Sequence, residues 1–181
     1  MFRDPTPRGH SMYNFFVGRQ RWISERDYAR RVAGSAVMML AGQRYGLECL
    51  QRGADLNKRP CPGGVAPDVG VALARLEKHF AFVGLTDHWA RSICLFHIRF
   101  GGPCLLHEFD NTHRTHYAHT SNDILKNKRP LGGLVDKADQ TLYAHASARF
   151  WRDADKYKAT AERCARDVCP EARHLFREPE P

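Results

Sequence analysis

Apolar residues recur along much of the chain at spacings typical of a helix that is buried on one side. Two stretches show steps of four, three and four: Val69, Leu73, Leu76 and Phe80, and then Trp89, Ile93, Phe96 and Phe100. Both are predicted to be helices with one buried stripe. The short run 80–85 between them is apolar and rich in branched and aromatic residues, which predicts a buried strand. A helix, a strand and a helix in this order indicate an α/β fold.

Helix ends can be recognised in the first part of the chain. Asp4 can cap a helix whose first residue is Pro5, and Ser24, followed by an acidic residue three positions later, predicts a second helix start. The apolar stretch 32–40 comes next and is closed by Gly42. We therefore expect helices on both sides of residue 24.

The second half shows similar signals. Thr86 is predicted to cap the helix after the strand, and Gly101 is predicted to end it. A last helix starts near Asp136 and carries an apolar residue at every fourth position, at Ala138, Leu142, Ala146 and Phe150. Residues beyond Pro170 are predicted to fray.

The chain length and the positions of loop-type segments predict one domain with two long loops. A chain of 181 residues has the length of one domain. Residues 51–68 are rich in Gly and Pro and predict a loop. Residues 103–130 are polar, rich in His, Asn and Thr, and show no clear period, so we expect a second long loop of the kind that often carries function.

The charge makes polyanions plausible partners. The formal net charge is +8, and residues 1–60 carry 11 Lys and Arg against 5 Asp and Glu. Nucleic acid, anionic sugars and phosphorylated cofactors all fit such a balance, as does an ordinary solvated face. Because no recognition-helix, RNA-recognition or arginine-rich signature occurs, a basic nucleic-acid-binding module is only an alternative, and no nucleic-acid partner is expected.

Six cysteines occur without any C-x-x-C pair, so no zinc-ribbon site is predicted. An even number suits disulfides, with Cys164 and Cys169 as a local pair, and buried free thiols fit equally well. Cys94 lies on the apolar side of its predicted helix, where a free thiol is the commoner state.

The chain shows no sign of a membrane anchor or a secretory leader. No apolar run approaches the roughly 18 residues of a membrane helix, and the first eight residues include Arg3, Asp4, Pro5, Pro7 and Arg8. Composition by itself therefore assigns no location.

The N-terminal segment Arg3-Asp4-Pro5-Thr6-Pro7-Arg8-Gly9-His10-Ser11-Met12-Tyr13 resembles the R-D-P-x-x-R-x-x-S-x-Y segment of sulfotransferases that use 3′-phosphoadenosine 5′-phosphosulfate (PAPS). The resemblance implies that Arg3 ends a parallel strand, that Pro5 begins a helix, and that Arg3 and Ser11 bind the 3′-phosphate of the donor. A phosphate also favours the free amides of a helix start, which this segment is expected to offer. The alternative is an ordinary capped helix with surface arginines.

A second segment carries a more specific resemblance. Residues 76–102, which contain the sequence Phe80-Ala81-Phe82-Val83-Gly84-Leu85-Thr86 followed by Trp89 and Ser92, are similar to the F-x-h-V-G-h-T-E-x-h-x-x-S-h-x-L element of Golgi carbohydrate sulfotransferases. Asp87 replaces the usual Glu and keeps an acid in the first helical turn.

Two weaker matches follow the family's order along the chain. Residues 33–42 resemble a G-C-Q-x-K-M-L-x-G stretch, although Ser35, Ala36 and Met38 replace its polar residues. Residues 139–150 resemble a terminal D-x-x-L-Y-x-x-A-x-x-x-F helix. The resemblance therefore covers roughly residues 1–155, as a partial sulfotransferase domain, with 156–181 as a helix end and tail.

The resemblance implies the C-terminal part of a P-loop-like, three-layer α/β sulfotransferase fold, mostly helical in this chain with a strand near 80–85. PAPS would be the donor, without a metal, and the parent enzyme would transfer a sulfuryl group to a glycan hydroxyl. A Golgi, type II membrane parent is implied. In the polar loop, Arg114 is the candidate for binding the adenosine end, with Thr115 and Ser121 as helpers.

The same loop admits a different chemistry, because His113, His116 and His119, with His107 nearby, have side chains that bind transition metals. His97, within an apolar helix, is interpreted as a buried, hydrogen-bonded histidine and not as a catalytic base.

No G-x-x-x-x-G-K-[ST] or K-x-G-[ST]-[ST] sequence occurs to hold the 5′-phosphosulfate. No catalytic residue is therefore assigned. We expect either a fragment of a complete sulfotransferase, whose missing N-terminal half would be a partner, or a shortened relative that binds nucleotide or a partner without catalysis. The first is favoured, because helices without the central sheet would expose apolar faces.

Overall fold

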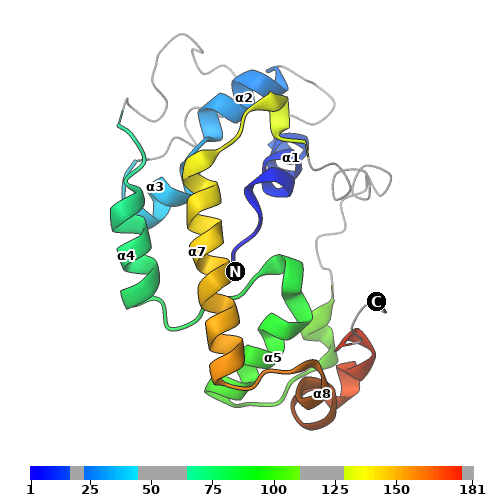
Figure 1. Cartoon of the computed structure of the whole chain (residues 1–181). Coiled ribbons are helices and arrows are strands. Elements are labelled where there is room, and N and C mark those ends of the chain that lie inside the picture. Colours follow the sequence, from blue (N-terminus) through cyan, green and yellow to red (C-terminus); the bar gives the residue numbers. More distant parts are fainter. Residues whose placement is uncertain (17–22, 45–64, 111–128, 177–181) are drawn as a thin grey trace. The chain divides into compact units, whose positions relative to one another are not determined.

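The computed structural model describes residues 1–16, 23–44, 65–110 and 129–176, and most of them are helical (Figure 1). Contacts between residues divide the chain into two compact units. Unit 1 comprises Met1–Arg3, Phe80–Arg114 and His145–Pro181, and unit 2 comprises Asp4–His79 and Thr115–Ala144. Helix α7 (Lys137–Lys156) contributes its first turns to unit 2 and the rest to unit 1. Each unit is described by itself below.

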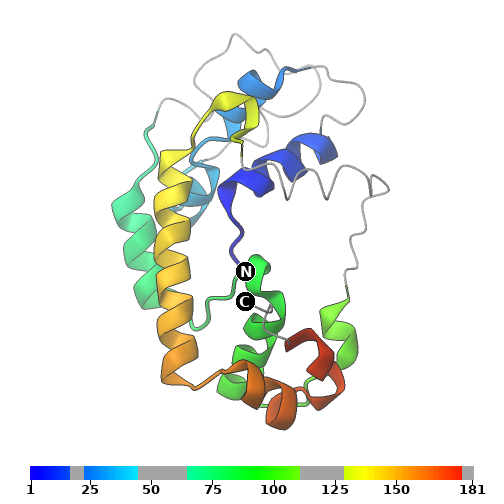
Figure 2. The ribbon, with the colours of Figure 1, turned by 45° about the vertical axis from the view of Figure 1, so that its right-hand side comes forward.

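Unit 2 is built from short helices. Its elements are α1 (Pro5–Phe16), α2 (Glu25–Val32), α3 (Ser35–Ala41), α4 (Val69–His79) and the 3₁₀ turn η5 (Leu131–Gly133). Figures 1 and 2 both show α3 beside α4. A small apolar core forms where α1, α2 and η5 meet, with Tyr13 and Tyr28 in edge contact at 5.3 Å between ring centres. The Tyr13 hydroxyl donates to the Ile23 carbonyl at 3.0 Å, so the polar end of this buried ring is satisfied.

The predicted helix starts in unit 2 are confirmed, and the sequence pattern missed one break. Pro5 begins α1, and the Ser24 hydroxyl accepts the Asp27 N–H at 3.1 Å as the cap of α2. The apolar stretch 32–40 is interrupted at Gly34, whose φ of 73° is left-handed. A side chain there would place its Cβ 2.3 Å from the Pro67 ring, so the close approach requires glycine.

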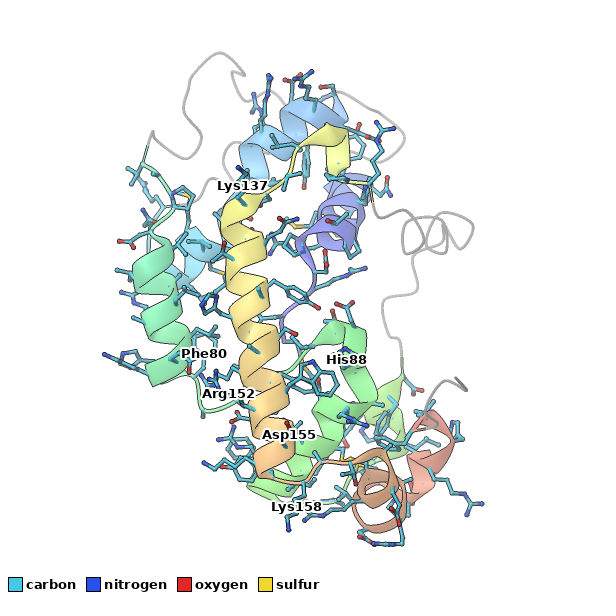
Figure 3. All side chains as sticks on the ribbon, in the orientation of Figure 1. Phe80, His88, Lys137, Arg152, Asp155 and Lys158 are labelled. Carbon is cyan, nitrogen blue, oxygen red and sulfur yellow. A yellow bond between two sulfur atoms is a disulfide. The ribbon has the colours of Figure 1, made fainter. Side chains whose placement is uncertain are left out.

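Unit 1 is also helical and contains two disulfides. Its elements are the 3₁₀ turns η3 (Thr86–His88), η4 (Leu106–Phe109) and η7 (Pro170–Phe176), the helices α5 (Trp89–Phe100) and α8 (Ala161–Arg163), the π turn η6 (Cys164–Val168), and the end of α7. Phe80 and His88 are drawn on opposite sides of α7 in Figure 3. The Arg149 guanidinium donates to the Phe80 carbonyl at 2.5 Å, and the His88 ring stacks on Phe150 at 6.1 Å. These contacts attach the end of α7 to the chain before and within η3.

The helix predicted from Asp136 is confirmed, because the Asp136 carboxylate accepts the Asp139 N–H at 3.1 Å just before the first turn of α7. Three of the four apolar residues at four-residue spacing are fully buried, namely Leu142, Ala146 and Phe150. The spacing therefore identified the packed stripe of α7 correctly.

The predicted strand over 80–85 is wrong for the described residues. They contain only an isolated parallel bridge between Phe2 and Leu85, formed by Phe2 N–H to the Gly84 carbonyl at 2.7 Å and Thr86 N–H to the Phe2 carbonyl at 2.8 Å. A strand needs a partner along its length, and here the pairing among the described residues consists of this one bridge with its two hydrogen bonds. The described fold is therefore mostly helical, and β-type pairing among the described residues is limited to this one bridge.

Two predictions about cysteines and the C-terminus are corrected. Cys94, expected as a free thiol, is bonded to Cys164, and Cys104 is bonded to Cys169, so Cys164 and Cys169 are not a local pair. The buried side of α5 faces η6, which brings the Cα atoms of Cys94 and Cys164 to 5.7 Å. Residues 170–176, expected to fray, form η7 with Ala172 and Phe176 buried, because the second disulfide attaches the start of this turn.

Thr86 does not cap α5 as predicted. Its Oγ1 is buried without a hydrogen-bond partner in the described chain, and α5 begins only at Trp89, after the turn η3. The N–H and the carbonyl of the neighbouring Leu85 are hydrogen-bonded instead by Ser92.

Among the described helices, none has the length and apolar character that crossing a membrane would require.

Candidate functional site

The segment with the sulfotransferase-like motif changes from extended backbone to helix within three residues. Phe2 pairs in parallel with Leu85, Arg3 follows directly, and the Asp4 carboxylate accepts the Thr6 N–H at 2.7 Å. Pro5 is the first residue of α1. Along the chain, the isolated bridge at Phe2 is followed by Arg3, by the Asp4 cap and by the start of α1 at Pro5.

The helix start does not offer the free amides that were expected there. Pro5 and Pro7 have no N–H, the Thr6 N–H donates to Asp4, and the Arg8 N–H donates to the Asp4 carbonyl at 3.1 Å. The Asp4 carboxylate also places negative charge at this end of the helix. An anion near this segment would therefore depend on side chains, and the prediction of a backbone contribution is wrong.

Arg3 and Ser11, the two residues predicted to bind a phosphate, are both half-buried. Arg3 belongs to unit 1 and Ser11 to α1 of unit 2, so the structure describes each within its own unit and not as one assembled site. Within the described residues, neither side chain forms a hydrogen bond or an ion pair. Both side chains are thus free of internal partners in the part of the chain that is described.

In the described part of unit 2, the Asp139 carboxylate accepts hydrogen bonds from three donors, and the sequence did not single out this residue as a site residue. It accepts the N–H groups of Ala36 at 3.1 Å and Val37 at 2.9 Å, at the start of α3, and a hydrogen bond from the Arg8 guanidinium of α1. Its side chain is fully buried, whereas that of Arg8 is 24% exposed. Asp139 therefore joins three helices, each from a different motif segment.

A second carboxylate lies beside it. Asp136 accepts the Gly34 N–H on both oxygens, at 3.1 and 3.0 Å, in addition to capping α7. Burial raises the pKa of the Asp136 carboxyl, the neighbouring Asp139 charge raises it further, and the two N–H groups and Arg8 oppose the change. Two acids thus share one positive side chain and the backbone amides around α3.

A small pocket of about 30 Å³ opens beside this cluster. Its walls come from α1, α2, the start of α3, η5 and the start of α7, including Thr6, Arg8, Met12, Ser35, Leu134 and Gln140. Such a volume holds one or two waters and is far below the roughly 300 Å³ of a typical ligand pocket. We therefore assign no substrate to it.

In the second motif segment, the hydroxyl of Ser92 bonds the backbone of Leu85. Ser92 is fully buried, and its Oγ accepts the Leu85 N–H at 2.9 Å and donates to the Leu85 carbonyl at 3.0 Å. The serine of α5 therefore fixes the extended backbone that pairs with Phe2. Its role here is structural.

His97 is the buried, hydrogen-bonded histidine that the sequence predicted. Its Nε2 lies 2.9 and 3.1 Å from the two Glu108 carboxylate oxygens, and its Nδ1 lies 3.3 Å from the Gly101 carbonyl. Although burial acts in the opposite direction, the Leu105 N–H and His97 together lower the pKa of the Glu108 carboxyl. The ligand atoms of His97, Cys104 and Glu108 lie within 4.8 Å of one another.

Several predicted residues lie outside the described residues. These are Arg114, Thr115 and Ser121, proposed for the adenosine end of the donor, and His113, His116 and His119, considered as metal ligands. His107 is described and lies in η4. The loop interpretation is therefore unchanged by the structure.

No protein-family model, curated protein or solved structure matches this chain. A signal for Asp139 was present in the sequence, because it is the first residue of the weakly matching D-x-x-L-Y helix. Its partner Arg8 is the second arginine of the R-D-P-x-x-R motif.

Proposed function

We propose that this chain is the 3′-phosphate-binding, C-terminal part of a P-loop-like α/β sulfotransferase. Its parent would transfer a sulfuryl group from PAPS to a hydroxyl of a glycan, in the Golgi. For the residues of this chain we propose a role in binding the nucleotide of that donor.

One observation carries the proposal. The backbone before Arg3 is extended and pairs in parallel with the backbone before Thr86, and the backbone after Arg3 is capped by Asp4 and becomes α1. These two segments are the two better motif matches, about 80 residues apart in sequence. The resemblance implies a parallel strand before Arg3, and a parallel bridge directly before this arginine supports the proposal.

The Asp139 cluster gives further support. The segments that meet at this carboxylate are the R-D-P-x-x-R helix, the 33–42 stretch and the terminal D-x-x-L-Y helix, all of which resemble the same family. Chance matches scattered along a chain have no reason to converge on one buried group. The convergence therefore favours a common origin for the matches.

Binding of the 3′-phosphate would use side chains. The Arg3 guanidinium supplies planar donors and a permanent charge, and the Ser11 hydroxyl supplies a neutral donor. Neither has an internal partner within the described residues that a phosphate would have to displace. Arg114, Thr115 and Ser121 remain proposed contacts to the adenosine end.

The test compares two nucleotides by isothermal titration calorimetry. Adenosine 3′,5′-bisphosphate should bind the chain more tightly than adenosine 5′-monophosphate, which lacks only the 3′-phosphate. Arg3→Ala should weaken the bisphosphate about tenfold to hundredfold, since a hydrogen bond to a charged group contributes about 1.5 to 3 kcal/mol. Ser11→Ala should weaken it less.

The matched control is Arg26→Ala, which removes an exposed arginine from α2. It should leave the preference for the bisphosphate unchanged. Equal affinity for both nucleotides, or an equal loss in the Arg26 and Arg3 variants, would show that the chain only attracts anions in general. Tighter, salt-dependent binding to oligonucleotides would favour the nucleic-acid alternative.

A further inference from the structure

Four potential metal ligands gather in unit 1, between α5, η4 and the start of η7. His97, Cys104 and Glu108 offer ligand atoms within 4.8 Å of one another. Cys169 must be added, because its sulfur is bonded to that of Cys104. In the oxidised chain these two sulfurs bind each other, and only reduction would make them thiolates, the form that ligates a metal.

The surroundings of these ligands resemble an ordered outer shell. The Gly101 carbonyl lies 3.3 Å from Nδ1 of His97, which leaves Nε2 directed at Glu108. A backbone acceptor on one ring nitrogen fixes the tautomer in which the other can bind a metal. The Glu108 carboxylate is itself held by the Leu105 N–H at 2.7 Å. The histidine and the carboxylate are thus already oriented.

The contact between His97 and Glu108 also marks a place for a cation. The two Glu108 carboxylate oxygens lie 2.9 and 3.1 Å from Nε2 of His97, so a nitrogen and an oxygen that can each bind a metal already lie next to each other. His97 is buried, and Glu108 is about one-third exposed. Such a pair offers a nitrogen and an oxygen ligand close to the sulfur of Cys104, which is bonded to that of Cys169.

We propose that reduction of the Cys104–Cys169 disulfide converts this cluster into a tetrahedral Zn²⁺ site with His97, Cys104, Glu108 and Cys169 as ligands. A dithiol reductant would supply two electrons and two protons, giving two thiols and the oxidised reductant. Zn²⁺ then binds the two thiolates, the unprotonated Nε2 and one carboxylate oxygen, and each of the two thiols releases one proton. Two soft sulfurs with one imidazole and one carboxylate suit zinc better than calcium or magnesium.

This metal site could not be predicted from the sequence, because the spacing of its two cysteines is unlike that of a zinc ribbon. Cys104 and Cys169 are 65 residues apart, and no C-x-x-C pair exists. The prediction of no zinc-ribbon site rested on that absence. The packing of η6 and η7 against α5 and η4 brings Cys169 to the other three residues.

Co²⁺, a spectroscopic substitute for zinc, tests the proposal on the full chain. After reduction under anaerobic conditions, one equivalent of Co²⁺ should give the visible bands of a tetrahedral ion and a thiolate charge-transfer band, and Zn²⁺ should abolish both. The oxidised chain should give neither. His97→Ala should weaken the Co²⁺ affinity at least about 100-fold, because even outer-shell changes cost about 10- to 100-fold. The control is His107→Ala, because His107 lies in η4 beside the ligand Glu108 but is not itself a proposed ligand. This variant should leave the Co²⁺ affinity unchanged.

A second measurement keeps the proposal testable if reduction weakens the fold. Zn²⁺ present during reduction should slow the alkylation of Cys104 and Cys169, whereas the alkylation of Cys94 and Cys164 should not depend on Zn²⁺, as read by mass spectrometry of the peptides. Alkylation of Cys104 and Cys169 that is the same with and without Zn²⁺, a tetrahedral band that persists in His97→Ala, or a reduced chain that does not bind Zn²⁺ would each overturn the site.

Discussion

The Arg8 guanidinium donates a hydrogen bond to the Asp139 carboxylate, across 131 residues of sequence. Asp139 also accepts two N–H groups at the start of α3, so one buried acid connects α1, α3 and α7. The cost of burying this charge is offset by three donors, of which only Arg8 carries a full positive charge. The pair is therefore expected to control the stability of unit 2.

Arg8→Ala should lower the free energy of unfolding by about 2 to 4 kcal/mol, since it leaves a buried carboxylate without its cation. Urea unfolding followed by circular dichroism measures this. Arg26→Ala, at an exposed position of α2, should change it by less than about 0.5 kcal/mol. If Arg8→Ala is as harmless as this control, or if its effect adds to that of Asp139→Ala without coupling, the pair has no special role.

Helix positions could be predicted well because they depend on local chemistry. Pro5, Ser24 and Asp136 set helix starts through their own backbone or side chain, and the stripe on α7 follows from its spacing. The break at Gly34 could not be predicted, because the pattern of apolar residues continues across it. It depends on Pro67, which lies more than 30 residues away and packs against the glycine.

The pairing of distant cysteines and of distant backbone segments could not be predicted from the sequence, for a related reason. The bond between Cys94 and Cys164 joins residues separated by 70 positions, and many pairings of six cysteines are possible. The strand at 80–85 was expected from composition alone, although a strand exists only where a second segment pairs with it. At the site, Arg3 follows an isolated bridge and not the parallel strand that the resemblance implied, and the amides expected to be free at the helix start are bonded to Asp4 or absent at the prolines.

Stability should depend on pH through Asp136. Burial and the Asp139 charge raise the pKa of the folded Asp136 carboxyl above its unfolded value of about 3.9, so the folded state holds the proton more tightly. This group's contribution is therefore fully present below about pH 4 and is lost as the pH rises through the raised pKa. Asp136→Asn, which cannot ionise, should remove this loss.

Urea unfolding of both proteins at several pH values checks the sign. The free energy of unfolding of the asparagine variant minus that of the wild type should increase as the pH rises from about 4 towards neutrality. A difference that stays constant over this range, or that changes in the opposite sense, would show that the Asp136 pKa is not raised.

The disulfide connectivity can be tested directly by mass spectrometry of peptides from the unreduced protein. Cross-linked peptides should join Cys94 to Cys164 and Cys104 to Cys169. Replacing Cys94 and Cys164 together by alanine should cost about 3 to 5 kcal/mol, as expected for a loop of this length. A peptide in which Cys164 is joined to Cys169 would contradict the described packing of η6 and η7.

Ser92→Ala should loosen the paired backbone at Leu85 without disturbing unit 2. The variant leaves the buried Leu85 N–H and carbonyl without the hydroxyl that bonds both, at an expected cost of about 1 to 3 kcal/mol. Hydrogen exchange should then become faster at the Leu85 amide and at the Phe2 amide, which donates to the neighbouring Gly84 carbonyl. Ser147→Ala, on the half-buried side of α7, serves as the matched control. If exchange at Leu85 is the same in both variants, the serine does not hold the pairing, and the motif match at this position has no structural meaning.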